Sequence, residues 1–271
     1  MSRIKKLAEY IFYFFHSKSS PKVNYEFLNN FIKYCIKENP DSQKFSTIES
    51  VRNDLLKSTD IVNVTDYGQG SKKQKTTSAP GEYPAIYSRK LADIAKYSLK
   101  TPRECLLIAS IINYLKPSEI IELGTSLGIT TAYMSTAYPN SSITTIEGCP
   151  ETANIARQIF SKLNLNNINV INSSFEDSLD KYLQKTETVD MAFIDGNHDY
   201  APLMSYFKTL VNQMSENGII IIDDIRWSDK MRKAWKEIKL HEKVGASIDL
   251  FDLGILFFNK TPEKQHLMIW K

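Results

Sequence analysis

Cysteine is scarce in this sequence. The three cysteines, Cys35, Cys105 and Cys149, lie far apart in the 271 residues and form no CxxC pair. An odd and sparse cysteine count fits neither the disulfide framework of a secreted protein nor a zinc site built from cysteines. We therefore expect a protein that works in a reduced compartment, the cytoplasm.

Long hydrophobic runs are also missing, since no stretch reaches the ~18 to 20 apolar residues of a membrane span. The apolar segment 7–15 is interrupted by Glu9, and its apolar residues recur at helical spacing. This pattern predicts an amphipathic helix that docks on protein, not a signal peptide. Phe12, Phe14 and Phe15 offer apolar area that a second copy of the chain could cover. We expect a soluble protein without a membrane partner, and a homodimer through the N-terminal helices is left open.

The sequence has no strong excess of charge, because 34 Lys and Arg against 31 Asp and Glu give a net charge of +3. Basic residues are more frequent in the N-terminal part but scattered, apart from Lys72, Lys73 and Lys75. A basic stripe interleaved with aromatic residues, which is typical of nucleic-acid binding, is missing. The share of 42% hydrophobic and 24% charged residues is ordinary for a globular protein. We expect a small-molecule substrate and no nucleic-acid partner.

From about Pro117 onward, β-branched segments alternate with amphipathic ones, as in a parallel sheet with crossover helices. The expected strands are 119–123, 143–147, 168–172, 191–195, 218–223, 246–251 and 255–259, and the expected helices between the first five are 129–138, 151–163, 176–184 and 200–214. The connection between the last two strands is too short for a helix and predicts an antiparallel hairpin. The fold class is therefore α/β, a Rossmann-like sheet of seven strands with five parallel βα units and an antiparallel terminal hairpin. Residues 266–270 could add an edge strand.

The part of the chain before this sheet predicts a helical cap. Segments 24–38, 47–58 and 86–115 have helical spacing. Between them, residues 65–84 are rich in Gly, Ser, Thr, Lys and Pro, which predicts a long polar loop. Such a loop is either an active-site lid or a plain connector. We expect two domains, the cap at 1–104 and the sheet domain at 105–271.

A glycine turn follows the first strand of the sheet. In the segment from Glu122 to Gly128, Gly124 would let a ligand approach the backbone and Gly128 would let the next helix start close to the strand. The G-x-G-x-x-G spacing of dinucleotide folds is absent, and so is the lysine of a phosphate loop. Glu147 ends the second strand, where a carboxylate can accept both hydroxyls of a ribose. The two features together indicate a nucleoside-containing cofactor.

These motifs resemble the class I S-adenosylmethionine-dependent methyltransferases, and most of all the catechol O-methyltransferase type and its bacterial relatives. The resemblance covers residues 105–259 and rests on the segments 122–128, 146–150, 193–200 and 218–224. It implies that the methionine end of S-adenosylmethionine lies against the first motif, the ribose on the strand-two acid, and the adenine beside the residues after strand three. The residues implied to bind the cofactor are Glu122, Gly124, Thr125, Ser126, Gly128, Glu147, Ser174, Phe175 and Asp195.

The cation-dependent branch of this family binds Mg²⁺ with an Asp after strand four and an Asp-Asn pair after strand five. Asp195 and Asp223 match that pattern, whereas Asp224 stands in place of the Asn. Three carboxylates at converging strand ends repel one another unless a cation or protons intervene, and Mg²⁺ suits an oxygen-only set better than Zn²⁺. The resemblance thus implies a metal site at Asp195, Asp223 and Asp224. In the alternative interpretation the acids hold no metal, and Asp199 or Asp224 caps a helix.

His198 follows Asp195 by three residues, at the place where the catechol-type enzymes carry a lysine general base. An unperturbed histidine has a pKa of ~6.5 and can take a proton from a hydroxyl near neutral pH. The resemblance therefore implies catalytic roles for His198 and Asp195. The alternative is a structural histidine that orients its loop.

Several other side chains are candidates near this centre. Trp227 and Tyr200 could wall a substrate pocket. Arg226 could meet an anionic substrate or form a salt bridge, and Tyr67 could close over the cofactor. The aromatic residues expected in the core are Trp235, Phe257 and Phe258.

The sequence thus predicts an S-adenosylmethionine-dependent methyltransferase, most simply an O-methyltransferase of a small hydroxylated molecule. Three other functions compete with it. They are a metal-independent methyltransferase acting on another atom or on a macromolecule, a nicotinamide-dependent oxidoreductase, and a catalytically idle binding protein on the same fold. The missing G-x-G-x-x-G and the terminal hairpin argue against the oxidoreductase. The identity of the substrate depends on the N-terminal helices and loops, which lie outside the resemblance.

Overall fold

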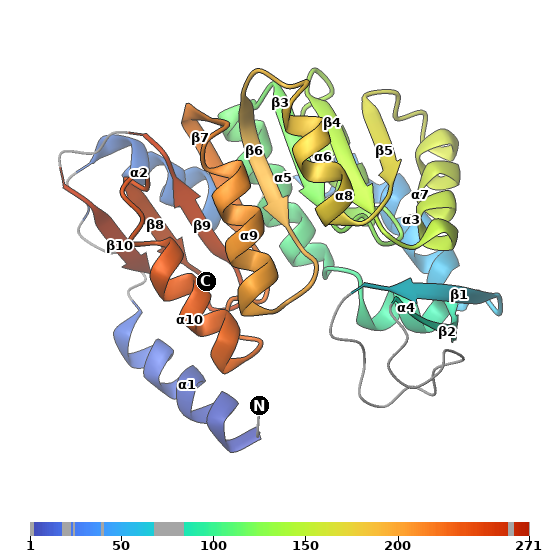
Figure 1. Ribbon diagram of the computed structural model, residues 1–271, viewed down its shortest axis with the longest axis horizontal. Helices are drawn as coiled ribbons and strands as arrows, with labels where there is room; N and C mark the ends of the chain where they lie inside the picture. The colour runs from blue at the N-terminus through green and yellow to red at the C-terminus, as the bar shows by residue number, and fades with distance from the viewer. Residues whose placement is uncertain are drawn as a thin grey trace. The chain divides into compact units, whose positions relative to one another are not determined.

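The computed structural model describes residues 3–17, 23, 25–38, 41–67, 84–259 and 263–270 (Figure 1). The chain divides into two compact units, Lys33–Ser178 and a second unit made of Met1–Ile32 and Leu179–Lys271. The predicted domain boundary at residue 104 stays a prediction. The predicted polar loop 65–84 lies almost wholly outside the described residues.

The unit Lys33–Ser178 contains three parallel strands in the order β3-β4-β5, and a separate antiparallel hairpin of β1 and β2. The β3 side chains Ile120, Ile121 and Leu123 are fully buried, which explains why this segment reads as a nearly continuous apolar run. Its elements are η1 (Ile32–Lys37), which straddles the boundary, η2 (Gln43–Phe45), α3 (Ser46–Lys57), β1 (Ile61–Asp66), β2 (Ala85–Lys90), α4 (Leu91–Tyr97), α5 (Pro102–Leu115), β3 (Glu119–Leu123), α6 (Ile129–Ala137), β4 (Ser142–Glu147), α7 (Pro150–Lys162) and β5 (Ile168–Asn172).

The second unit contains the strand order β10-β8-β9-β7-β6 (Figure 1). The parallel pair β6 and β7 is followed by the antiparallel strands β9 and β8, and β10 runs parallel to β8 at the edge. Its elements are α1 (Arg3–His16), α2 (Glu26–Phe31), most of α8 (Phe175–Leu183), β6 (Val189–Ile194), α9 (Tyr200–Leu210), β7 (Met214–Ile222), α10 (Asp229–Ile238), β8 (Ala246–Asp249), β9 (Gly254–Phe257) and β10 (Gln265–Met268).

The predicted fold class is confirmed, because the strands are mostly parallel and alternate with helices. The four isoleucines 219–222 of β7 are all fully buried, as expected for a strand covered on both faces. The terminal hairpin and the edge strand are also confirmed. Among the described helices, none is long and apolar enough to cross a membrane.

One prediction about the N-terminal part is wrong. Residues 86–90 were expected to be helical but form strand β2, which pairs with the unpredicted strand β1. Cross-strand contacts stabilise this pairing, because Tyr87 donates a hydrogen bond to Asp66 (2.8 Å) and Ser88 donates one to Asn63 (2.9 Å). Tertiary pairing here overrides the local helical spacing. Helix α5 begins where the sequence suggests, with Thr101 and Glu104 in a capping box and Pro102 in the first turn.

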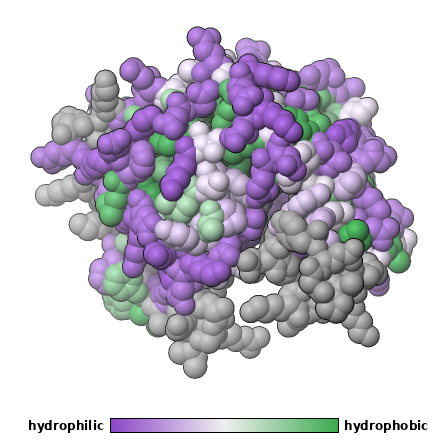
Figure 2. Space-filling model, in the orientation of Figure 1, coloured by the Kyte–Doolittle hydropathy of each residue, from purple (hydrophilic) through white to green (hydrophobic). Residues whose placement is uncertain are grey.

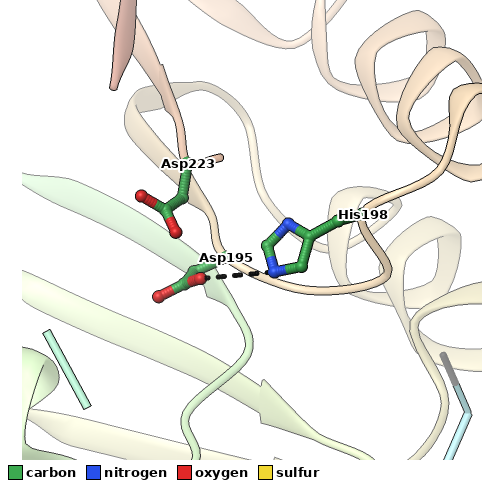
Figure 3. Close-up of side chains that lie close together, drawn as sticks. All are labelled: Asp195, His198 and Asp223. Carbon is green, nitrogen blue, oxygen red and sulfur yellow. Dashed lines mark ion pairs between the residues drawn. The ribbon is translucent and has the colours of Figure 1, made fainter. Parts of the chain in front are cut away.

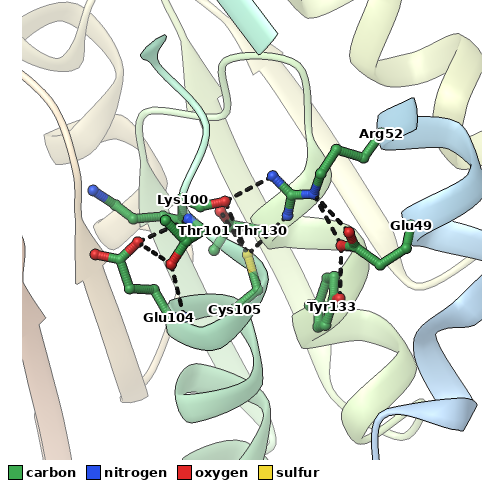
Figure 4. Close-up of polar contacts among 8 residues, drawn as sticks. All are labelled: Glu49, Arg52, Lys100, Thr101, Glu104, Cys105, Thr130 and Tyr133. Atoms are coloured by element: carbon green, nitrogen blue, oxygen red, sulfur yellow. Dashed lines mark hydrogen bonds and ion pairs between the residues drawn. The ribbon is translucent and has the colours of Figure 1, made fainter. Parts of the chain in front are cut away.

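A buried polar network joins α3 to α5 and α6 (Figure 4). The Arg52 guanidinium is 6% exposed and donates hydrogen bonds to Glu49 (2.9 Å), the Lys100 carbonyl (2.7 Å) and the Cys105 sulfur (3.4 Å). Tyr133 of α6 donates a further hydrogen bond to Glu49 (2.7 Å). Burial raises the pKa of Cys105 to about 11, so this thiol stays protonated at neutral pH. All three cysteines are free and buried, as expected for a chain without disulfides.

We predict that Arg52→Ala strongly destabilises the fold, because it removes a buried guanidinium with its hydrogen bonds and leaves the half-buried Glu49 carboxylate without its cationic partner. The free energy of unfolding should fall by about 3 kcal/mol. The control is Lys57→Ala, an exposed position on the same helix, where the change should stay within about 0.5 kcal/mol. Urea unfolding followed by circular dichroism measures both. Equal urea midpoints for the two variants would show that the network does not stabilise the fold.

Candidate active site

The glycine turn after β3 has the backbone conformation that the motif predicts. Gly124 has φ 108° and Gly128 has φ 77°, both in the region that favours glycine, and Ser126 between them has φ 49°. A Cβ atom on Gly128 would lie 2.6 Å from the ring of Phe160 on α7. The start of α6 therefore packs so tightly against α7 that only glycine fits there.

The Glu147 carboxylate is held at the end of β4. It accepts hydrogen bonds from the backbone N–H of Ser126 (2.8 Å) and of Cys149 (2.9 Å). One carboxylate thus ties the glycine turn to the loop after β4. The Thr152 side chain also hydrogen-bonds to this carboxylate. A carboxylate has about four acceptor positions, so these contacts leave room for about one further donor. Burial raises the pKa of Glu147 above its usual range, and the two N–H groups act in the opposite direction.

Glu122, which was predicted to bind the cofactor, is fully buried. Its carboxylate accepts hydrogen bonds from the hydroxyls of Thr131 on α6 (2.5 Å) and Thr145 on β4 (2.6 Å). Thr145 in turn contacts the hydroxyl of Thr125 in the glycine turn (2.5 Å). Through Thr145 and Thr125, these contacts hold the glycine turn in place. The predicted contact of Glu122 with the cofactor stays a prediction.

The hairpin of β1 and β2 lies beside this acid, which the sequence did not predict. A Cβ atom on Gly148 would meet the ring of Tyr67 at 2.6 Å, so this ring packs directly on the backbone next to Glu147. The charge of Asp66 contributes to the raised pKa of Glu147. Asn63 also anchors the hairpin to α7 through two hydrogen bonds to Glu151 (2.8 and 3.0 Å). In the sequence, Tyr67 alone was singled out as a candidate to lie near the cofactor site; the strands β1 and β2 beside Glu147 were not predicted.

The residues that follow β5 cap the first turn of α8. Ser174 accepts a hydrogen bond from the backbone N–H of Asp177 (3.1 Å) and donates one to its carboxylate (2.6 Å), as an N-cap does. The Ser173 N–H donates to the Glu147 carbonyl (3.1 Å), which keeps this segment next to the acid. The predicted adenine contacts of Ser174 and Phe175 stay predictions.

In the other unit, three side chains with metal-binding atoms come together where β6 and β7 end (Figure 3). Asp195 follows β6, Asp223 follows β7, and the His198 ring points toward both carboxylates. One oxygen or nitrogen atom from each lies within 4.8 Å of the others. Asp223 is 1% exposed, whereas the side chains of Asp195 and His198 are 17% and 26% exposed. Asp223 therefore lies on the buried side of the cluster, and Asp195 and His198 lie on the side that solvent reaches.

His198 takes a more central place in this cluster than the sequence predicted. Its Nε2 atom lies 3.9 Å from Asp195 and 3.6 Å from Asp224. Asn197 and Asp224, one in each of the two loops, both have positive φ values, 50° and 53°. Of the predicted metal set, Asp195 and Asp223 lie together with His198, and Asp224 lies beside the imidazole. A metal site at Asp195, Asp223 and Asp224 stays a prediction. Asp199 is a helix cap, since it accepts from the Tyr200 N–H.

The candidate pocket residues separate into two groups. Trp227 is 59% exposed and its ring centroid lies 6.1 Å from that of His198; its contact with a substrate stays a prediction. Tyr200 instead donates a hydrogen bond to Glu237 of α10 (2.6 Å). Arg226 forms a two-pronged ion pair with Asp249 (2.6 and 2.8 Å), which favours the salt-bridge alternative over an anionic substrate. The aromatic residues Trp235 and Phe257 are buried, and Phe258 is half-buried.

A family of methyltransferase domains matches residues 121–225. This segment starts inside β3 and ends just after β7, so it includes both the glycine turn and the cluster at Asp195. No curated protein matches the chain.

Solved structures share the fold at low sequence identity. A Podospora anserina methyltransferase bound to S-adenosylhomocysteine is 17% identical, with a TM-score of 0.57 over 90% of this chain and 99% of that one. A Bacillus cereus O-methyltransferase in complex with S-adenosylhomocysteine is 17% identical, with a TM-score of 0.55 over 86% and 97%. A Staphylococcus aureus structure described as a putative caffeoyl-CoA O-methyltransferase is 18% identical, with a TM-score of 0.54 over 62% and 88%. A segment of this chain, residues 121–225, thus matches a family of methyltransferase domains, and the solved methyltransferase structures share its Rossmann-like fold.

Proposed function

We propose that the chain transfers the methyl group of S-adenosylmethionine to a hydroxyl oxygen of a small molecule. The observation that carries this proposal is the Glu147 carboxylate, which is fixed beside the glycine turn by two backbone N–H groups. The cluster of Asp195, His198 and Asp223 supplies the groups that deprotonation of a hydroxyl needs. The O-methyltransferases among the structural neighbours support the same reaction type.

The chain's own residues fit the cofactor. Besides its contacts with the backbone and with Thr152, Glu147 keeps an acceptor position for a ribose hydroxyl. The glycine turn presents backbone without bulky side chains to the methionine end, because Gly124 carries no Cβ. Tyr67, packed on Gly148, gives the neighbouring surface an aromatic ring. We assign the ribose to Glu147 and the methionine end to residues 124–128.

We assign the deprotonation of the acceptor hydroxyl to His198. Its Nε2 atom lies near two carboxylates, which stabilise the imidazolium that forms when it takes the proton. The acceptor oxygen then attacks the methyl carbon as the carbon–sulfur bond breaks, and S-adenosylhomocysteine leaves as a neutral thioether. Trp227 would hold the acceptor, because its ring is exposed beside His198.

A divalent cation fits the same cluster. Asp195 and Asp223 would hold it with carboxylate oxygens, and the buried Asp223 carboxylate gains most from a cation because its charge is removed from water. A bound Mg²⁺ would lower the pKa of the acceptor hydroxyl and stabilise the resulting oxyanion. In this arrangement His198 would still take the proton of the acceptor hydroxyl.

We predict that Glu147→Gln weakens the binding of S-adenosylhomocysteine about 10- to 100-fold, because the ribose loses a charged acceptor. The new amide N–H₂ group would also face the N–H of Ser126 or Cys149. Isothermal titration calorimetry measures the dissociation constant. Glu187→Gln, an exposed carboxylate before β6, is the control and should bind as the wild type does. Equal affinity of both variants would remove the ribose assignment.

The raised pKa of Glu147 predicts a pH dependence of cofactor affinity. The ionised carboxylate accepts the ribose hydroxyls, so affinity should fall as the pH drops toward this pKa, above the usual glutamate range near ~4.3. The same carboxyl is protonated more readily in the folded than in the unfolded chain. Its contribution to the free energy of unfolding therefore falls as the pH rises from the usual glutamate pKa to the raised pKa of the folded chain. Titrations of the wild type at several pH values should show the affinity loss, whereas the Glu147→Gln variant should show a flat profile there.

We predict that His198→Ala lowers kcat about 100-fold or more with a hydroxylated aromatic acceptor, because the variant lacks the general base that removes the proton of the acceptor hydroxyl. The affinity for S-adenosylhomocysteine should change less than twofold. His241→Ala, a histidine outside the cluster, serves as the control with unchanged kcat. Retained kcat in His198→Ala together with normal cofactor binding would favour an idle or differently acting centre.

The same assay with a chelator decides between the two branches of the reaction. We expect turnover to fall with chelator and to return with Mg²⁺, and Asp223→Asn to need more Mg²⁺ than the wild type. An unchanged rate in the presence of the chelator would show that the methyl transfer does not require a metal.

A further inference from the structure

Helix α1 has one face that docks on its own unit. Tyr13 is 1% exposed, and its hydroxyl donates hydrogen bonds to the carbonyls of Asp249 and Ile269. Glu9 forms an ion pair with Arg232 of α10 (2.8 Å). These contacts confirm the predicted docking of this helix on protein, and they fix which side of α1 faces away from the fold.

The other face of α1 carries large apolar side chains in contact with solvent. Ile11 is 47% exposed, Phe12 is 56% exposed and Phe15 is 76% exposed. Residues 11, 12 and 15 fall on one side of a helix, because positions three and four apart are neighbours. Figure 2 shows hydrophobic residues gathered on α1, at the lower left of the view. We call these three residues the outer apolar face.

The sequence around this face is strongly basic. Glu9 is the only acidic residue among residues 1–25, and its charge is already matched by Arg232. The basic residues of the same segment are Arg3, Lys5, Lys6, Lys18 and Lys22. An apolar helix face flanked by Lys and Arg on both sides is the composition of helices that lie in a membrane interface.

We propose that the outer apolar face of α1 docks on an anionic lipid surface. Phe12 and Phe15 would enter the boundary between headgroups and acyl chains, and the net positive charge of the sequence 1–25 favours acidic headgroups. Charge separates this occupant from a second copy of the chain. Two copies joined through α1 would bring two basic segments together, whereas an anionic bilayer neutralises one. This contact goes beyond the methyl-transfer function and does not depend on it. It replaces the expectation from the sequence that the chain has no membrane partner.

The test is co-sedimentation of the full chain with two kinds of vesicle, one of phosphatidylcholine alone and one with phosphatidylglycerol added. We expect the partition coefficient to be at least tenfold higher on the anionic vesicles and to fall when salt is raised. The double variant Phe12→Ser, Phe15→Ser should lose at least tenfold of this binding. Tyr97→Ser, which removes an aromatic side chain that is 70% exposed on α4, is the matched control and should bind normally.

A second variant, Lys5→Glu with Lys6→Glu, tests the charge without touching the outer apolar face, and it should also lose the preference for anionic vesicles. Thermal unfolding of every variant checks that the fold is kept. Equal binding to both vesicles, or none to either, would overturn the proposal. If a dimer is then seen by size-exclusion chromatography with light scattering, and the Phe12→Ser, Phe15→Ser variant is monomeric, the occupant is a second copy of the chain.

Discussion

The hydrogen bonds from the Ser126 and Cys149 N–H groups to Glu147 join the glycine turn to the loop after β4. They set where the glycine turn lies relative to the end of β4. The buried Glu122 supports the same turn through Thr131 and Thr145. Because both carboxylates act on residues 124–128, the backbone conformation there is determined before any ligand arrives. Such preorganisation lowers the cost of ordering the site on binding.

A different constraint governs the cluster of Asp195, His198 and Asp223. Like charges at this separation raise the free energy of the folded chain unless something compensates them. His198 supplies one compensation when it is protonated, since its Nε2 atom lies near Asp195 and Asp224. A divalent cation supplies a second one. The chemistry that we assign to this centre depends on this repulsion between carboxylates. A proton taken by His198 and a cation held by the carboxylates both reduce it.

The sheet could be read from the sequence because each strand is a short apolar run with a helix-length segment behind it. The ends of these strands located Glu147, Asp195 and Asp223 directly. The β1–β2 hairpin was missed, because its two strands are joined by a long polar segment and β2 has helical spacing in the sequence. The place of His198 between two carboxylates was also beyond sequence reasoning, because it depends on how the loops after β6 and β7 meet. Asn and Asp adopt positive φ values more often than most residues, but the sequence does not show that Asn197 and Asp224 are the ones that do.

The most direct test of the central claim is the fate of the methyl group. The wild-type protein would be incubated with S-adenosylmethionine carrying a ¹³C-labelled methyl group and with a set of small hydroxylated aromatic acceptors, and the products followed by NMR. Our account predicts that the label appears as a methyl ether on an acceptor oxygen, with one S-adenosylhomocysteine formed per label transferred. Label on nitrogen or carbon, or no transfer by a protein that binds the cofactor, would contradict it.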